Sequence, residues 1–137
     1  MLVINQLGFE TAADTFNARE LDRFAEQLAD DIVFDAPGKS CATGKEACVA
    51  FYDDLFQAFP DAQFDVRELY VIDEIVVEEG TFIGTHTGVG RTNRTISIEY
   101  VQVLRYREGE LVALNLKLDR LLMLEQLGLI TEPERLW

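Results

Sequence analysis

The chain has 137 residues, of which 48% are hydrophobic, and its 25 acidic and 12 basic side chains give a net charge of −13. This length allows a core that needs no disulfides or structural metals, and we expect one domain over residues 1–137. The negative charge repels nucleic-acid phosphates and anionic lipid headgroups, so it argues against nucleic-acid and membrane partners and disfavours a polyanionic substrate.

The sequence lacks the signals of export, membrane insertion and metal binding. No segment approaches the roughly 18 to 20 continuous apolar residues of a membrane span, and the first residues carry no basic leader, so we expect a cytoplasmic protein. Cys41 and Cys48 have no partner histidine nearby and belong to no cysteine-dense pattern. They are predicted to be free thiols, and no metal site is expected.

The first third of the chain alternates between helical patterns and one short strand. Apolar residues recur at helical spacing over residues 6–17, and Asn17 with Glu20 has the form of a capping box that opens a second helix. Residues 32–35 form a short strand that Ala-Pro-Gly ends. Thr43 with Glu46 predicts another capping box, followed by a helix with a broad aromatic face that Pro60 terminates.

The remainder of the chain has the pattern of two hairpins and a closing helix. Residues 64–72 and 75–87 are predicted strands joined at Asp73-Glu74, and residues 95–106 and 110–118 are strands joined at Glu108-Gly109, a pair that suits a tight turn. A last helix is expected from about Arg120 to Leu127, with Gly128 as its stop. Helices segregated from an antiparallel sheet indicate the α+β class.

A regular turn at Glu108-Gly109 would place particular polar residues opposite one another. In that register Asp119 faces Ile98, Lys117 faces Tyr100 and Asn115 faces Gln102, so the polar side chains share one face of the sheet. The sequence leaves open whether that face lines a pocket or meets solvent or a partner chain, and a β-bulge would switch part of the pattern.

Asp119 is the leading candidate for function because it joins a long apolar strand to an apolar helix. A carboxyl in an apolar pocket has a raised pKa and can act as acid and base in turn. An aspartate directly before a helix is also a preferred N-cap, and capping favours the ionised form. Both readings stay open at this stage.

Several segments together resemble the SnoaL-like polyketide cyclase family over nearly the whole chain: Gly-Thr-His-Thr-Gly at 84–88, Val103-Leu-Arg-Tyr106, and Leu118-Asp119 leading to Glu125-Gln-Leu-Gly-Leu129. The resemblance implies the nuclear transport factor 2-like fold, a cone-shaped curved antiparallel sheet wrapped by three N-terminal helices, with a short C-terminal helix. It also implies an apolar pocket, frequent homodimers, and an intramolecular aldol reaction that uses no metal or organic cofactor. In the family, the aspartate that matches Asp119 is the proposed acid/base.

One departure from the family concerns the residues that precede that aspartate. Ala113-Leu114-Asn115 stands where relatives often have Glu-His-Trp, so an imidazole frequently found near the acid is absent. This difference questions the polyketide substrate more than it questions the pocket.

The remaining candidates are side chains that could orient a substrate in such a pocket. His86, the only histidine, ends a strand and could transfer protons near neutral pH, or it could be a hydrogen-bonded structural residue. Tyr52 and Phe56 lie on the aromatic face of the covering helix, and Asp35 is a second carboxylate that could instead form a turn. Tyr100, Gln102, Asn115 and Lys117 are further candidates for binding substrate, from the polar face of the predicted hairpin.

The sequence thus predicts an enzyme of the cyclase or isomerase type, acting without a cofactor on a small, largely apolar carbonyl compound. Asp119 would be the general acid/base, and His86 would assist it. The alternative is a non-catalytic module of the same fold that binds a small ligand or dimerises. The sequence contains no P-loop, dinucleotide fingerprint or Ser-His-Asp order, which removes the commonest kinase, dehydrogenase and hydrolase readings.

Overall fold

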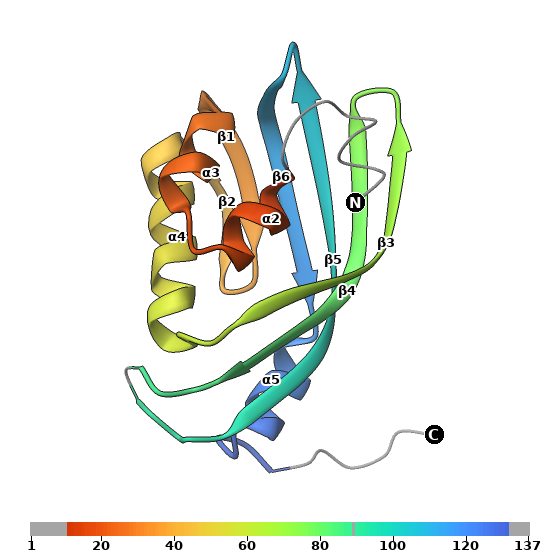
Figure 1. The fold of residues 1–137 in the computed structure, drawn as a ribbon. Coiled ribbons are helices and arrows are strands. Elements are labelled where there is room, and N and C mark those ends of the chain that lie inside the picture. Colours follow the sequence, from red (N-terminus) through yellow and green to blue (C-terminus); the bar gives the residue numbers. More distant parts are fainter. Residues whose placement is uncertain (1–10, 89, 132–137) are drawn as a thin grey trace.

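The computed structural model describes residues 11–88 and 90–131, and their strands form one six-stranded sheet in the order β2-β1-β6-β5-β4-β3. Figure 1 shows this sheet curving strongly along β3, β4 and β5. The strands are β1 (Leu28–Ala36), β2 (Lys39–Thr43), β3 (Gln63–Ile72), β4 (Ile75–Thr85), β5 (Thr95–Arg107) and β6 (Glu110–Leu118).

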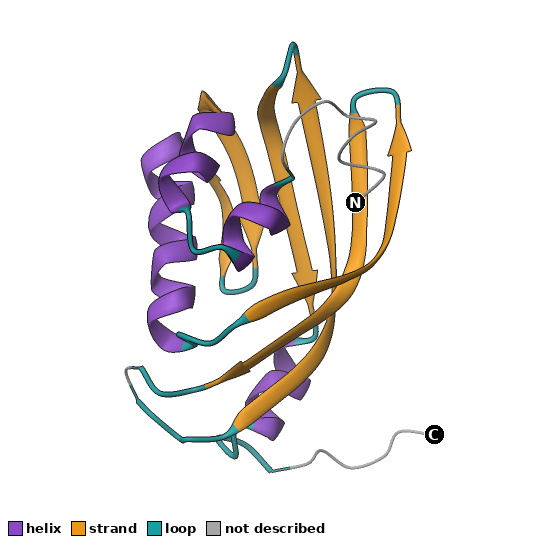
Figure 2. Ribbon diagram, viewed as in Figure 1, coloured by secondary structure: helices purple, strands orange, loops and turns teal. Residues whose placement is uncertain are grey.

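Helices cover the concave face of the sheet, which we call the inner face (Figure 2). They are α2 (Ala12–Asn17), α3 (Leu21–Gln27) and α4 (Lys45–Ala58), and a last helix, α5 (Arg120–Gln126), lies beyond the end of β6. This architecture confirms the predicted α+β cone. The predicted first helix began at residue 6, and its part before residue 11 lies outside the described residues. Within the described part, no helix has the length and hydropathy needed to cross a membrane.

The inner face is apolar because side chains alternate along each strand. On β5, the even-numbered residues from Ile96 to Tyr106 are buried, whereas most of the odd-numbered residues are exposed. Aromatic rings fill much of the space between this face and the helices: Phe16, Phe24, Tyr52, Phe56, Phe59, Phe64, Phe82 and Tyr100. Cys48, a free thiol, is also buried in this core. The side chain of Cys41 lies outside the described residues.

Both predicted hairpins are confirmed. β3 pairs with β4 up to Ile72 and Ile75, on either side of the Asp73-Glu74 turn, and β5 pairs with β6 from Arg107 and Glu110. At the second turn both Glu108 (φ 52°) and Gly109 (φ 83°) have positive φ, as a tight two-residue turn between twisted strands requires.

The predicted register of β5 and β6 holds only for the two residue pairs next to the turn, because β6 contains a bulge. Arg105 pairs with Ala113 but Tyr106 pairs with Leu111, which leaves Val112 without a partner. Beyond the bulge, Leu116 faces Gln102 and Leu118 faces Tyr100. Leu114, Leu116 and Leu118 are thereby turned to the inner face, and Asn115 and Lys117 are turned to the outer face.

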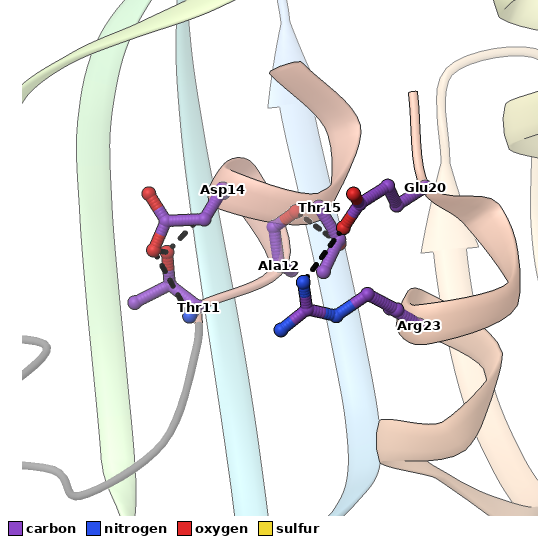
Figure 3. A network of polar contacts seen from close by, with 6 residues as sticks. All are labelled: Thr11, Ala12, Asp14, Thr15, Glu20 and Arg23. Carbon is purple, nitrogen blue, oxygen red and sulfur yellow. Dashed lines mark hydrogen bonds and ion pairs between the residues drawn. The ribbon is translucent and has the colours of Figure 1, made fainter. Parts of the chain in front are cut away.

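The helix starts differ from the predicted capping boxes. Thr11 and Asp14 form the capping box of α2, with the Thr11 hydroxyl donating to the Asp14 carboxylate at 2.8 Å (Figure 3). Asn17 instead pairs its side-chain amide with the backbone of Phe64 on β3, and Glu20 caps α3 without a side-chain hydrogen bond. Gly44 precedes α4, so Thr43 is not its cap.

The pairing of β1 and β2 with the rest of the sheet was only partly predicted. The short strand predicted at residues 32–35 is the middle of β1, which pairs parallel with β6 and antiparallel with β2. The predicted sheet was antiparallel throughout. Parallel pairing of segments far apart in the chain leaves no local turn signal in the sequence.

A side-chain amide fixes α5 to the sheet. β6 ends opposite Tyr100, so no strand of the described residues pairs with the first residues of β5 on that side. Gln126 of α5 fills this place, since it accepts from the Ser97 backbone N–H at 2.8 Å and donates to the Ser97 carbonyl at 3.1 Å. Gly128 (φ 74°) then ends the helix as predicted.

Candidate functional site

A chain of buried polar side chains crosses the centre of the inner face. The Tyr52 hydroxyl donates to Gln102 Oε1 at 2.9 Å, Gln102 Nε2 donates to Glu78 Oε1 at 3.3 Å, and the Tyr100 hydroxyl donates to the same Glu78 oxygen at 2.5 Å. Each of these four residues is at most 2% exposed. We call Tyr52, Glu78, Tyr100 and Gln102 the buried acid cluster.

Strand register and one glycine place the members of the cluster. Glu78 on β4 pairs with Gln102 on β5, and Gly80 pairs with Tyr100. A Cβ atom at Gly80 would lie 2.2 Å from the Asp65 carbonyl oxygen and 3.0 Å from the ring of Tyr100. Glycine therefore leaves room for the bulged backbone of β3 and for the tyrosine ring, whose hydroxyl reaches Glu78. Tyr52 approaches from α4.

Burial makes Glu78 a weak acid. Loss of solvation raises its pKa from 4.5 to about 7, against the hydrogen bonds from Tyr100 and Gln102, which lower it. The charge of Asp14 on α2 raises this pKa further. Burial also raises the pKa of Tyr100 and of Tyr52, so both phenols stay protonated as donors. Burial thus holds the Glu78 carboxyl protonated at pH values where exposed glutamates are ionised.

An apolar cavity of about 300 Å³ lies beside this cluster, between α4, the end of β6 and α5. We call it the α4–α5 cavity. Its lining residues are apolar apart from Asp54 and Arg120: Pro37, Phe51, Asp54, Leu55, Leu116, Leu118, Arg120 and Met123. Leu116 and Leu118 lie opposite Gln102 and Tyr100 on the neighbouring strand, so the cavity and the cluster are adjacent.

A second hollow flanks the cluster on the side of β3. This groove of about 450 Å³ runs between α2 and β3, and its lining includes Leu69, which pairs with Glu78, and Val66, which pairs with Gly80. Asp14 and Asp65 also line it, with no cation among the lining residues. Two carboxylates make this groove the less suitable of the two for an apolar or anionic molecule.

Asp119 is exposed and caps α5. Its Oδ1 accepts from the backbone N–H of Leu122 at 2.9 Å, so the capping reading of the sequence is confirmed. Its neighbours Leu118 and Arg120 line the α4–α5 cavity, but Asp119 does not. The dry surroundings that the acid/base hypothesis requires are found at Glu78 rather than at Asp119.

Three of the predicted binding residues lie together on the outer face. Asp35 forms an ion pair with Lys117 at 3.7 Å, and Asp35 and Asn115 are partners in the register of β1 and β6. The β6 bulge is the reason why Asn115 and Lys117 do not join Tyr100 and Gln102, as the predicted register required. Of the predicted residues, Tyr52, Tyr100 and Gln102 are brought together.

His86 and Phe56 are not members of the buried acid cluster. His86 is 8% exposed, its Nδ1 lies 3.2 Å from the Thr92 hydroxyl, and its ring packs against Phe59. These contacts match the structural reading of this histidine. Phe56 belongs to the aromatic core, with the guanidinium of Arg19 over its ring.

Glu78 was missed at the sequence level, although a signal was present. On β4, Val76, Glu78, Gly80 and Phe82 share one face, so Glu78 is a lone charge on an apolar face. In the described residues, no three His, Cys, Asp or Glu side chains are grouped as ligands for a metal.

A strongly curved sheet with helices over its concave face is the architecture of the nuclear transport factor 2-like class of α+β cones. The sequence profile of the SnoaL-like domain matches residues 9–114. The chain therefore belongs to the SnoaL-like domain family. Among proteins with curated descriptions, none matches it.

Solved structures share this fold at low sequence identity. AclR from Streptomyces galilaeus, assigned as a hydroxylase, has a TM-score of 0.76 at 22% identity, covering 90% of this chain and 80% of AclR. A protein assigned as a SnoaL-like polyketide cyclase from Jannaschia sp. CCS1 has a TM-score of 0.74 at 18% identity, covering 83% and 81%. IdmH from Streptomyces antibioticus, assigned as a polyketide cyclase, has a TM-score of 0.73 at 25% identity, covering 85% and 92%.

Proposed function

We propose that this protein is an acid/base enzyme of the cyclase or isomerase type, acting on a small, largely apolar carbonyl compound. The observation that carries the proposal is Glu78, a carboxyl group bonded to Tyr100 and Gln102 in the core, with a pKa of about 7. A group that is half ionised near neutral pH can remove and return protons with little bias in either direction.

The reaction class follows from what a single carboxyl can do. Ionised Glu78 would remove a proton from the carbon next to a carbonyl, and protonated Glu78 would then deliver a proton to the alkoxide or enolate oxygen. Both donors converge on Glu78 Oε1, so Oε2 is the oxygen left to exchange protons with a substrate. Such a step uses only side chains of this chain. IdmH, at 25% identity, supports a polyketide-like substrate.

The α4–α5 cavity would hold the apolar body of the substrate. Its lining of phenylalanine, leucine, methionine and proline carries little polarity, and its wall at Leu116 and Leu118 adjoins the cluster. His86 and the outer-face residues Asp35, Asn115 and Lys117 take no part in the proposed step. Asp119 remains a candidate to be tested against Glu78.

The test compares Glu78→Gln with Asp119→Asn. The probe is 2-tetralone, a small apolar ketone with acidic protons beside its carbonyl, and the measurement is deuterium exchange in D2O followed by proton NMR. We expect Glu78→Gln to lower the exchange rate by a factor on the order of 10² to 10⁴ while affinity for the ketone is kept. Asp119→Asn keeps a good N-cap and should leave the rate unchanged.

Two results would contradict the proposal. An unchanged rate in Glu78→Gln would remove Glu78 from the chemistry, and a loss confined to Asp119→Asn would return the acid/base role to Asp119. Carboxyl-carbon NMR on the native protein adds a readout that needs no substrate, because Glu78 should titrate near pH 7.

A second candidate is a non-catalytic module that binds a small ligand. One observation favours it: none of the four cluster residues lines the α4–α5 cavity or the groove between α2 and β3. A module predicts that the native protein binds 2-tetralone without any exchange, and that Glu78→Gln changes stability only.

A further inference from the structure

Arg120 lies at the rim of the α4–α5 cavity, and it is the only basic side chain among the described residues that line this cavity. Among residues 11–88 and 90–131 it forms no ion pair, whereas the nearby Lys117 is held by Asp35 at 3.7 Å. An unpaired guanidinium beside an apolar hollow is available to an anionic group of a ligand.

The turn between β1 and β2 lies beside this guanidinium. A Cβ atom at Gly38 would lie 3.4 Å from Arg120 Cζ and 3.5 Å from one terminal nitrogen, so the glycine leaves room for the guanidinium next to the turn. Glycine at this position therefore allows the head group of Arg120 to lie at the rim of the cavity.

We propose that the α4–α5 cavity binds a molecule with a compact apolar body and a single planar anionic group, a carboxylate or an enolate, which Arg120 holds by paired hydrogen bonds. This inference deepens the proposed function, since it names the substrate class of the same cavity. With its anion at Arg120, the ligand lays its apolar body along Leu116 and Leu118, on the side of Tyr100 and Gln102.

The other charges around the cavity restrict the ligand to a monoanion. Asp54 lines the same cavity and Asp35 lines the adjoining hollow together with Lys117 and Arg120. A second negative charge on the ligand would meet these carboxylates and the net charge of −13. Asp54 weakens anion binding even for a monoanion, so its removal should have the opposite effect to removal of Arg120.

The experiment compares 2-naphthoate with 2-naphthamide, which have the same rings and differ in charge, by isothermal titration calorimetry at pH 8. We expect the native protein to bind the carboxylate about tenfold more tightly than the amide. Arg120→Gln should abolish that ratio, and Asp54→Asn should increase the affinity for the carboxylate alone. Arg105→Gln, an arginine on the outer face, is the matched control and should leave the ratio unchanged.

The proposal is overturned by equal affinities in the native protein, by a ratio that survives Arg120→Gln, by weaker carboxylate binding in Asp54→Asn, or by a native protein that binds neither probe at millimolar concentration. Binding is measured without turnover, so these results are separate from the exchange assay. Glu78→Gln should keep the preference for naphthoate even where it abolishes exchange.

Discussion

At the scale of single residues, Glu78 is the exception among the acids of this chain. Of the acids in residues 11–88 and 90–131, it alone is buried, whereas Asp119 is exposed and caps a helix. Its burial is tolerated because Tyr100 and Gln102 bond to it and because it holds a proton over much of the pH range. The stability of this core is therefore expected to depend on pH.

Stability should fall as the pH rises from about 4.5 to about 7. Over this range Glu78 ionises in the unfolded chain but remains protonated in the folded protein, and unfolding is therefore favoured. The two pKa values correspond to a loss of about 3 kcal/mol in the free energy of unfolding, which stays constant above pH 7. Urea unfolding of the native protein and of Glu78→Gln at several pH values measures this loss in the free energy of unfolding.

The variant Glu78→Gln should lack this fall and be the more stable of the two at pH 8. Glu79→Gln, the next residue, serves as control and should keep the pH dependence, because its side chain points away from the core and pairs with Arg67. Parallel pH curves for the native protein and Glu78→Gln would show that Glu78 is already ionised in the folded state.

The hydroxyl of Tyr52 should matter through Gln102. Tyr52→Phe keeps the ring but leaves Gln102 Oε1 without its donor, which should cost about 1 to 3 kcal/mol of stability. The freed amide can then rotate and accept from protonated Glu78, so we expect a higher pKa at Glu78 by carboxyl-carbon NMR. Tyr70→Phe, at a residue that is 45% exposed, should change neither quantity.

At the scale of elements, β6 and α5 together set the border of the α4–α5 cavity. The β6 bulge turns Leu116 and Leu118 inward, and Asp119 then starts α5, which brings Arg120 and Met123 to the cavity. The position of α5 depends on Gln126, whose amide takes the place of a missing strand next to Ser97. Two hydrogen bonds thus connect the sheet to one wall of the cavity.

Gln126→Ala should loosen this wall. The loss of both hydrogen bonds to Ser97 predicts a decrease of about 1 to 3 kcal/mol in stability and weaker binding of 2-naphthoate. Thermal unfolding and calorimetry measure the two effects. Gln57→Ala removes a glutamine whose side chain donates to Asp53 on an exposed helix face and should alter neither. If binding is unaffected in Gln126→Ala, the cavity does not depend on the docking of α5.

At the scale of the whole molecule, the outer face of the sheet is the surface that a second copy would cover. Val33 and Val101 are 42% and 37% exposed there, and a hollow of about 350 Å³ lined by Val33, Val103 and Ala113 lies between β1, β6 and β5. Apolar residues on an otherwise charged surface favour association. The homodimer expected from the family resemblance remains a prediction.

Sedimentation equilibrium at micromolar concentration should give a mass near twice the 15.5 kDa of one chain. Val101→Glu places a charge on the outer face without touching the core and should shift the protein to the monomer, while Ile72→Glu, at an exposed strand end, should leave the dimer intact. A native mass near one chain would refute the dimer.

The sequence by itself determined the elements whose signals are local. Strand alternation, the Glu108-Gly109 turn and Gly128 predicted the two hairpins and α5 within one or two residues, because these features depend on near neighbours in the chain. The segments at 84–88, 103–106 and 118–129 also indicated the family that the profile match bears out.

Only the tertiary structure decided which carboxyl is buried. A single extra residue in β6 moved Asn115 and Lys117 to the outer face, and the pairing of β4 with β5 placed Glu78 between Tyr100 and Gln102. The change of phase at the bulge is hidden because residues 111–114 are all apolar, and desolvation is produced by residues distant in sequence. The proposed reactive group therefore depends on register and burial: the residue order along β4 marks Glu78 as a lone charge on an apolar face, but the residues that bury and bond it come from β5 and α4.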